Sequence, residues 1–438
     1  MLKIQFLRVF ATTMLVLHAT AAQAQTEIQW WHSMKGALND KVNEVAANFN
    51  ATQKDYKIVP VFKGEYPESM TAAIAAYRAG NAPHILQVFE VGTATMKAAK
   101  GAVVPVAKLM KDADEPFDPK AYLPAVAGYY TDSKGNMLSF PFNSSTIVFY
   151  VNKDAFKKAG LDAGKPPKTW KELVAAADKL KASGHSCPYT SGWPSWMHIE
   201  NFSAWHNVPI GTQENGMSGT DAQFQINSPL HVRHIGMMGD MSKKGTFSYA
   251  GRTNAAEAKF YSGECAMLTS SSGAQANIRR NAKFEWSVNF IPYHDDVKGA
   301  PQNSIIGGAS LWVMGGKTNN AYKGIAKFFA YLSRPEVQMD WHTSTGYVPI
   351  TMAAYEMTRK SGYYDKTPGA DIAVKQLTNK PPTANSKGLR FGNYVQGREV
   401  FEEEMESVFG GKKDAKTALD EAVKRGNEIL RKFQAVNK

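Results

Sequence analysis

An alternation of strand-like and helix-like segments constrains the fold of this chain more than any other feature. Leu38, Val42, Val45 and Phe49 recur at spacings of four, three and four residues, which places them on one face of a helix. Runs rich in Val and Ile flank that helix, and further helical runs follow. The alternating segments are residues 27–33, 36–51, 55–62, 68–80, 84–89 and 93–102. This spacing predicts βαβ units on a parallel sheet.

A second α/β pattern begins after the turn-rich residues 131–136. Residues 146–152 form an apolar strand pattern, and residues 165–184 form a helical pattern that Thr169 and Glu172 open with a capping box. A chain of 438 residues is too long for one ordinary core. Two α/β units are therefore expected.

The later part of the chain continues the second pattern with one gap. Residues 191–245 are aromatic and loop-rich, and their elements cannot be placed from the sequence. Strands are expected at residues 285–293 and 308–316, and helices at 320–333 and 415–433. Ser333 and Glu336 predict a capping box for one more helix.

The first residues predict a secretory signal peptide. Lys3 and Arg8 give a basic start, an apolar run follows, and residues 22–24 offer an A-x-A cleavage site. Cleavage after Ala24 removes residues 1–24 and implies export. A membrane anchor is the alternative, but the apolar run is too short to span a bilayer and lacks a stop-transfer flank.

The net charge of the chain favours an anionic small solute. It is +12 for the whole chain and +10 once Lys3 and Arg8 leave with the signal peptide. The basic residues are dispersed and no nucleic-acid-binding motif is present, so no nucleic-acid partner is expected. A basic surface still attracts anions, although dispersed charge does so weakly.

Cysteine and histidine usage gives no sign of metal or cofactor chemistry. Cys187 and Cys265 are the two cysteines, and export permits a disulfide, but their spacing leaves two free buried thiols as the alternative. The histidines of the exported part are scattered singly, in ordinary packed or surface roles, and no CxxC or HExxH motif occurs. No Ser-His-Asp order or nucleophile elbow stands out either. Binding without catalysis is therefore the expected class of function.

Three polar junctions beside apolar strand runs offer hydroxyl and backbone N–H groups to a ligand. Ser271 lies in TSSSG, which follows a strand and opens a helix, either as an anion site or as an ordinary cap. The glycine pair ending at Gly308 either lets a ligand approach the backbone or marks a bulge. Ser145, preceded by Asn143 and Ser144, lies either in a turn or beside a cleft.

Charged and aromatic residues supply the remaining candidates. Glu90 ends a strand run and either accepts hydrogen bonds from ligand hydroxyls or stays solvated. Arg398 either binds a phosphate with its guanidinium fork or pairs with a nearby glutamate. Tyr66 and Tyr347 lie in turn-like segments, and Trp193 in SGWPSW either stacks on a ligand or packs in a core. Together these residues predict a polar cleft without an evident catalytic base.

Several segments spread over residues 27–433 carry a resemblance to a known family. They include YKIVPVFKGEY, RAGNAPHILQVFEVGTATM, PFNSST, NKDAFKKAGLD, ENFSAWH, APQNSIIGGASLWVM and TGYVPIT, in this order. The chain resembles the extracytoplasmic solute-binding proteins of ABC importers, of the maltose-binding-like structural type. The resemblance implies an α/β fold of periplasmic binding protein type II, with a ligand cleft between two lobes. The lobes are expected to comprise residues 25–140 with 300–340, and residues 141–299 with 341–438.

The same resemblance implies the ligand and the role of each residue. The expected ligand is sn-glycerol-3-phosphate, extended to glycerophosphodiesters such as glycerophosphocholine, whose choline cation an aromatic face can meet. The residues expected to hold the phosphate are Ser145, Ser271, Gly308, Tyr347 and Arg398. Those expected at the glycerol are Glu90 and Tyr66, with Trp193 packed over the ligand.

The resemblance also implies where the protein works and with what. It is expected to be a periplasmic monomer that delivers its ligand to the membrane permease subunits of an ABC importer. One alternative is an oligosaccharide-binding protein of the same fold, which needs no arginine. The other is an exported phosphodiester hydrolase, which needs a metal site or a nucleophile–base pair that the sequence does not show.

Overall fold

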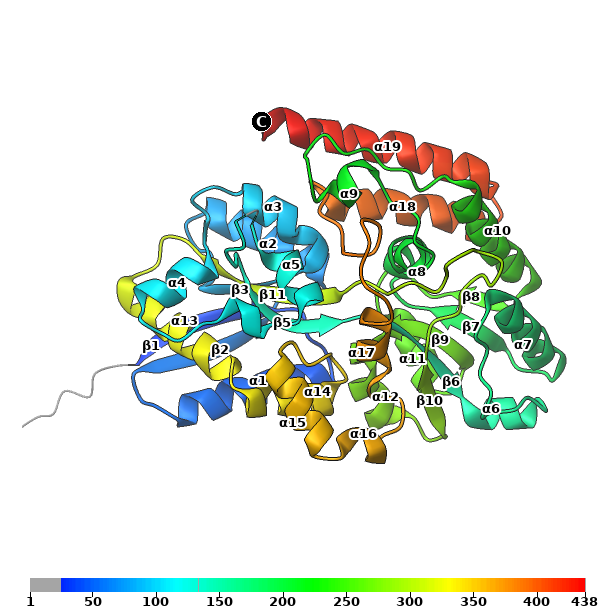
Figure 1. Ribbon diagram of the computed structural model, residues 1–438, viewed down its shortest axis with the longest axis horizontal. Coiled ribbons are helices and arrows are strands. Elements are labelled where there is room, and N and C mark those ends of the chain that lie inside the picture. Colours follow the sequence, from blue (N-terminus) through cyan, green and yellow to red (C-terminus); the bar gives the residue numbers. More distant parts are fainter. Residues whose placement is uncertain (1–24, 133, 438) are drawn as a thin grey trace, which may run out of the picture.

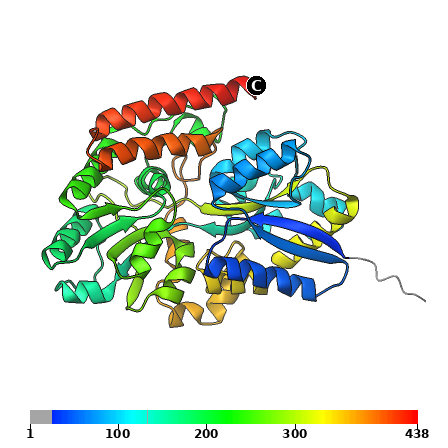
Figure 2. The same cartoon turned by 180° about the vertical axis from the view of Figure 1, so that it is seen from behind.

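The structure, a computed structural model that describes residues 25–437 except residue 133, contains two α/β lobes lying side by side (Figure 1). Helices cover both faces of the sheet in each lobe, as the view from behind shows (Figure 2). No helix among the described residues is both long and apolar enough to cross a membrane. The expected signal peptide, residues 1–24, lies outside the described residues, so cleavage after Ala24 stays a prediction.

The first lobe is built on a mixed sheet with the strand order β2-β1-β3-β11-β4, to which β5 adds by pairing with β11. Its strands are β1 (Thr26–His32), β2 (Tyr56–Phe62), β3 (Ile85–Phe89), β4 (Val103–Val104), β5 (Phe140–Ser145) and β11 (Gly307–Met314). β1 is parallel to β2 and β3, as the alternation predicts. β11 is antiparallel to β3, β4 and β5, which the alternation did not predict because β11 comes from far along the chain.

The helices of the first lobe include α1, whose buried face the sequence predicted. They are α1 (Ala37–Ala51), α2 (Tyr66–Arg78), η1 (Glu90–Gly92), α3 (Thr93–Ala98), α4 (Val106–Asp112), η2 (Pro119–Ala121), α5 (Pro124–Tyr130), α13 (Asn319–Leu332) and α14 (Pro335–Thr345). In α1, Val42, Val45 and Phe49 are buried, as their spacing predicts. The predicted capping box of Ser333 and Glu336 is wrong: α14 has Arg334 at its N-cap with no side-chain cap, and proline follows.

The second lobe has a mixed sheet in the order β10-β6-β9-β7-β8. Its strands are β6 (Ile147–Asn152), β7 (Cys187–Ser191), β8 (Phe247–Tyr249), β9 (Cys265–Ser271) and β10 (Trp286–Asn289). β7 is parallel to β8 and β9, whereas β6 is antiparallel to β9 and β10. The parallel βαβ arrangement therefore describes only part of each sheet.

The helices of the second lobe include the stretch that the sequence left unplaced. They are α6 (Lys153–Lys158), α7 (Trp170–Ala182), η3 (Trp196–Asn201), α8 (Phe202–Trp205), α9 (Thr212–Gly216), α10 (Pro229–Lys244), α11 (Ala255–Tyr261), η4 (Ser272–Ala274), α12 (Gln275–Asn281), α18 (Tyr394–Phe409) and α19 (Ala415–Val436). The predicted capping box of Thr169 and Glu172 opens α7 with both reciprocal hydrogen bonds. Residues 191–245 supply η3, α8, α9 and α10.

The chain passes between the lobes in short connections beside the cleft. β5 ends at Ser145 in the first sheet and β6 begins at Ile147 in the second, so residues 143–145 lie in a strand and not in a turn. A second passage joins β10 to β11. The last helices between the lobes are α15 (Met352–Lys360), α16 (Tyr363–Lys366) and α17 (Ile372–Leu377). Because α14 packs against α1 of the first lobe and α17 contacts β6 of the second, the chain returns to the second lobe between α14 and α17. The lobe limits predicted near residues 140, 300 and 340 stay predictions.

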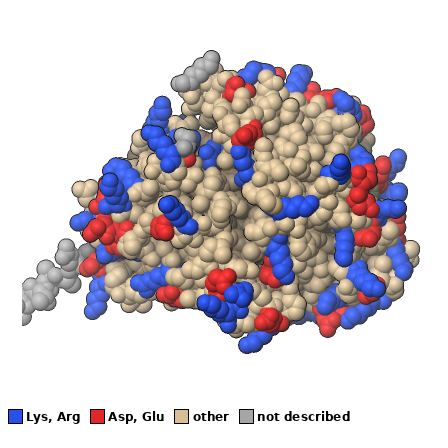
Figure 3. Space-filling model, in the orientation of Figure 1, with Lys and Arg blue, Asp and Glu red and all other residues tan. Residues whose placement is uncertain are grey.

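Charges of both signs are mixed over the molecular face that Figure 3 shows, where Lys and Arg alternate with Asp and Glu. Exposed ion pairs such as Lys57–Glu27, at 3.0 Å, are typical of this surface. Solvent screens such pairs, so they contribute little to stability. This face carries no continuous basic strip of the kind that binds nucleic acid.

Cys187 and Cys265 form a disulfide that joins the first residues of β7 and β9. The two residues are partners in the parallel register, with their Cα atoms 4.5 Å apart. Ser271 is at the opposite end of β9, roughly 20 Å away at the rise of a strand. The disulfide therefore ties the second sheet together without contacting the cleft.

Five histidines that are scattered in the sequence gather in the core of the second lobe; they are His198, His206, His231, His234 and His294. His198 Nδ1 and His234 Nε2 lie 3.0 Å apart, and the backbone N–H of His294 donates to His206 Nε2 at 2.8 Å. Burial lowers the pKa of His198 and of His206 to about 3. These rings are therefore neutral at neutral pH and must gain protons when the protein unfolds in acid.

We expect the unfolding free energy to fall between pH 6.5 and pH 5 because an unfolded histidine binds a proton with a pKa near 6.5, whereas the buried ring does not. In His198→Phe this pH-dependent loss should shrink by up to about 2 kcal/mol, whatever the substitution does to absolute stability. Urea denaturation at several pH values measures the difference. The matched variant His185→Phe, at a half-buried position, should change the pH-dependent loss of unfolding free energy less. If His198→Phe and the parent lose the same unfolding free energy between pH 6.5 and pH 5, the prediction is contradicted.

Candidate ligand-binding cleft

One cavity lies between the two lobes, and every site residue expected from the sequence lines it. The first lobe supplies Tyr66 at the start of α2, Glu90 in η1, Ser145 at the end of β5 and Gly308 in β11. The second lobe supplies Trp193, Ser271 and Arg398, and Tyr347 follows α14. Its lining combines aromatic side chains with a few hydroxyls, carboxylates and one guanidinium from both lobes, which is the kind of lining that binds a small polar molecule. Glu90, Ser145 and Ser271 lie at carboxyl ends of strands, where α/β folds bind their ligands.

Arg398 is the centre of a buried ion cluster that reaches across the cleft. It projects from α18 in the second lobe, and its Nε and Nη2 donate to the carboxylate of Glu200 at 2.6 and 2.7 Å. Nη2 also donates to Glu90 of the first lobe. Both interpretations of Arg398 are thus compatible with the structure: it pairs with glutamates, and its Nη1 donates no hydrogen bond within the described residues.

The cluster sets the charge of the cleft. Although burial disfavours a charged guanidinium, the carboxylates of Glu200 and Glu90 raise the pKa of Arg398 well above its ordinary value. Burial raises the pKa of Glu90 to about 7, with Arg398 lowering it and the charge of Glu200 raising it. Glu90 therefore changes protonation near neutral pH and can either accept a hydrogen bond from a ligand hydroxyl or donate one.

The tyrosine hydroxyl of Tyr66 is fixed by a chain of amide side chains that crosses the strand ends. The backbone N–H of Ser33 donates to Gln87, Gln87 donates to Asn143, and Asn143 donates to the Tyr66 hydroxyl, at 2.8, 2.8 and 2.9 Å. The Tyr66 ring also stacks on Phe89, with ring centroids 5.2 Å apart. The hydroxyl is thus held in the cavity before any ligand enters.

Ser271 has two roles at the end of β9. Its Oγ accepts the backbone N–H of Gly273 at 3.1 Å and so caps η4, and its side chain also lines the cavity. The capping role expected in the TSSSG segment thus belongs to Ser271, and neither neighbouring serine caps η4. Ser270 Oγ donates to Glu257 at 2.8 Å, and Ser272 Oγ is buried without a partner among the described residues.

Gly308 has a backbone conformation that only glycine adopts without strain. Its φ is +85°, and a Cβ at this position would lie 1.8 Å from the carbonyl oxygen of Asn143. The glycine therefore allows β5 and β11 to approach each other closely at the floor of the cavity. Both the close approach and the unusual conformation exclude a side chain here.

The structure adds cleft residues that the sequence interpretation missed or left unassigned. Glu257 lines the cavity, and burial raises its pKa to about 8. Ser33 and Trp196 also line the cavity, and Ser33 Oγ and Trp196 Nε1 are buried without a partner among the described residues. A polar residue directly after a strand run was a signal for Ser33. Glu257 and Glu200 gave none, because their partners lie elsewhere in the sequence.

Comparisons with known proteins place the chain among transport proteins. The family of bacterial extracellular solute-binding proteins matches residues 44–370. The sn-glycerol-3-phosphate-binding periplasmic protein UgpB of Yersinia pseudotuberculosis is 56% identical over 418 residues, which is 95% of each chain. The protein of the same name from Salmonella typhimurium is also 56% identical over 418 residues and 95% of each chain.

Solved structures share the fold at low sequence identity. UgpB from Mycobacterium tuberculosis in complex with glycerophosphocholine has a TM-score of 0.78 at 20% identity, over 93% of this chain and 99% of that one. The cyclic alpha-maltosyl-1,6-maltose binding protein from Arthrobacter globiformis has a TM-score of 0.71 at 20% identity, over 93% and 100%. These matches confirm the predicted fold of two α/β lobes.

The chain belongs to the bacterial extracellular solute-binding proteins. This membership confirms the predicted class of function, a binding component of transport and not an enzyme. The cavity between the lobes is where the fold offers such a solute its binding site.

Gly308→Ala should destabilise the protein because the new Cβ collides with the Asn143 carbonyl as well as straining the backbone. Gly316→Ala is the matched control, since Gly316 has a φ of +76° and nothing within 4 Å of the added carbon. We expect a loss of about 1 kcal/mol from strain in the control and at least about twice that in Gly308→Ala, measured by urea denaturation. Equal losses of unfolding free energy in the two variants would contradict the prediction, because they would show that β5 and β11 move apart at no energetic cost.

Proposed function

We propose that this chain captures sn-glycerol-3-phosphate in the periplasm and delivers it, as a monomer, to the permease subunits of an ABC importer. The observation that carries the proposal is that the residues expected to bind such a ligand, which come from segments spread between Tyr66 and Arg398, all line one cavity. Relatives that are 56% identical bear the name of sn-glycerol-3-phosphate-binding periplasmic protein, which supports the same ligand here.

The phosphate binds, in this proposal, where hydroxyls and backbone N–H groups surround the guanidinium. Ser145, Ser271 and Tyr347 offer hydroxyls, and Gly308 offers its backbone N–H. The Nη1 of Arg398, which donates no hydrogen bond among the described residues, completes the set of donors with a charge-assisted hydrogen bond. Phosphate oxygens accept several hydrogen bonds at once, so a shell of donors suits them better than a single cation does.

The glycerol part lies, in this proposal, against Glu90, Tyr66 and Trp193. Glu90 and the Tyr66 hydroxyl exchange hydrogen bonds with the glycerol hydroxyls, and the Trp193 ring covers them. Tyr66 and Trp193 have ring centroids 6.3 Å apart and so form one aromatic wall. The same wall can receive the choline cation of glycerophosphocholine, which extends the proposed ligands to glycerophosphodiesters.

Titration calorimetry with four solutes tests the proposal. We expect saturable binding of sn-glycerol-3-phosphate and glycerophosphocholine, weaker binding of inorganic phosphate, and no heat with maltose. Maltose binding without phosphate-ester binding would instead support an oligosaccharide-binding protein. Absence of heat with both phosphate esters would contradict the proposal.

Ser271→Ala should weaken phosphate-ester binding by about 1–3 kcal/mol, because it removes one hydrogen-bond donor to the phosphate. Ser272→Ala is the control, since it deletes the neighbouring hydroxyl, which does not line the cavity. Affinities come from calorimetry, and melting temperatures show that both variants are folded, because Ser271 also caps η4. Equal affinities for the two variants would exclude Ser271 from the site. Arg398→Ala is a poorer test, because it leaves Glu200 buried without its cation.

A further inference from the structure

Trp193 has a backbone conformation that needs an explanation. Its φ is +54°, in the left-handed region, which is a genuine outlier for a bulky residue. Such a conformation costs of order 1–3 kcal/mol and persists only where the surrounding structure fixes it. Because the Trp193 side chain lines the ligand cavity, the groups that fix this backbone also fix one wall of the cleft.

The backbone of Trp193 is held from both sides. Its N–H donates to the carbonyl of Thr253 at 3.0 Å, and its carbonyl accepts the N–H of Met197 at 2.8 Å. Arg252 and Asn254 flank Thr253 in the loop before α11, and Asn254 lines the cavity as well. The position of Trp193 thus depends on the position of this loop.

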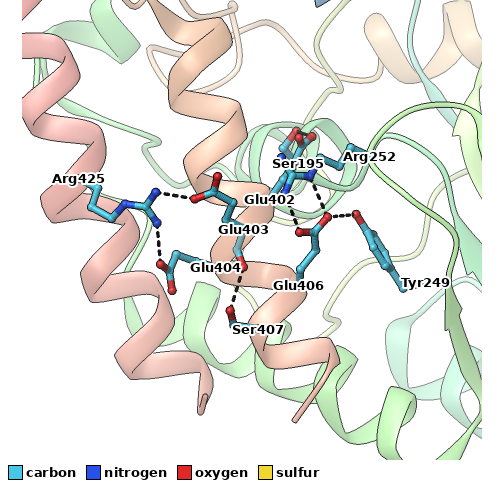
Figure 4. Close-up of polar contacts among 9 residues, drawn as sticks. All are labelled: Ser195, Tyr249, Arg252, Glu402, Glu403, Glu404, Glu406, Ser407 and Arg425. Atoms are coloured by element: carbon cyan, nitrogen blue, oxygen red, sulfur yellow. Dashed lines mark hydrogen bonds and ion pairs between the residues drawn. The ribbon is translucent and has the colours of Figure 1, made fainter. Parts of the chain in front are cut away.

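Two glutamates of α18 fix the Trp193 segment and that loop (Figure 4). Glu402 accepts a hydrogen bond from Ser195, two residues after Trp193, at 2.7 Å. Glu406 holds Arg252 with two hydrogen bonds of 2.8 and 2.7 Å and also accepts the hydroxyl of Tyr249. With Arg398, these glutamates recur every four residues, so one face of α18 carries all three.

Another set of contacts fixes α18 itself. Arg425 of α19 donates to Glu403 and to Glu404, as Figure 4 also shows, with the latter contact at 2.9 Å. These ion pairs join α18 to α19 and do not touch the Trp193 segment. Substituting Glu403 therefore changes a charge on the same helix without touching the contacts that hold Trp193, and it can serve as a control.

We propose that Glu402 and Glu406 are positioning residues that hold Trp193 over the cleft and thereby set the affinity for the part of the ligand that packs on its indole ring. The inference rests on the proposed function for the identity of the ligand, and on geometry alone for the position of Trp193. It makes α18 a common support for both ends of the ligand, with Arg398 at the phosphate and the glutamates behind the aromatic wall.

The position of Trp193 is tested first, without any ligand. Protein labelled with 5-fluorotryptophan gives one ¹⁹F resonance for each tryptophan, and Trp193→Phe assigns the resonance of Trp193 by its loss. We expect Glu406→Gln to shift or broaden the Trp193 resonance, because it weakens the hold on Arg252. The control Glu403→Gln makes the same charge change on α18 and should leave the resonance in place. An unchanged Trp193 resonance in Glu406→Gln would overturn the inference. This outcome does not depend on which ligand the protein binds, because the measurement uses none.

The consequence for binding is tested with a double-mutant cycle, with glycerophosphocholine as the probe. We expect Glu406→Gln to weaken binding by roughly threefold to tenfold in the parent and by less than about twofold in a Trp193→Ala background. Glu403→Gln should stay within about twofold of the parent. A loss of equal size in both backgrounds would mean that Glu406 acts through general stability and would overturn the inference. Arg252→Lys, which keeps the charge, should recover part of the affinity that Arg252→Ala loses.

Discussion

The buried cluster of Arg398, Glu90 and Glu200 is the interaction on which the cleft depends. Removing these charges from water is costly, and only their mutual attraction and hydrogen bonds offset that cost. Glu200 belongs to the same lobe as Arg398, whereas Glu90 comes from the other lobe, so one guanidinium links the two across the cavity. The carboxylate of Glu200 alone balances the charge of the guanidinium, and an ionised Glu90 adds a second negative charge. The hydroxyls, the backbone N–H groups and a Glu90 with a pKa of about 7 therefore have to accommodate an anionic ligand.

Around this cluster, the backbone geometry decides what the cavity can hold. Gly308 lets two strands meet at the floor, and the left-handed Trp193 turns its ring into the wall. The amide chain from Ser33 to Tyr66 fixes a hydroxyl between them. Each of these features uses the ends of strands, where the sheet stops pairing and polar groups become available. The two-lobed fold thus brings rigid donors from both sheets to one place.

Much of this arrangement could be predicted, because its signals are local or repeat a familiar pattern. Helical spacing located α1, the capping box located the start of α7, and TSSSG marked the end of β9. The candidate cleft residues followed from strand ends and from the family resemblance. The sequence predicted a strand at residues 308–316 but not the antiparallel pairing of β11 in the first sheet, and it did not predict the roles of the Glu200 and Glu257 carboxylates. The partners of these groups are distant in sequence; Glu200 and Arg398 are 198 residues apart. No short pattern encodes such a pairing.

The sequence by itself determined the α/β class and the types of side chain available to a ligand, since periodicity, composition and turn residues act over a few neighbouring positions. It also predicted an export signal in residues 1–24. Only the tertiary structure decided which of these groups meet. It gathered five scattered histidines into one core, joined Cys187 to Cys265, and gave the capping role to Ser271 instead of its neighbours. The physical reason is that burial and pairing depend on which strands and helices pack together, and that choice is made by the whole core.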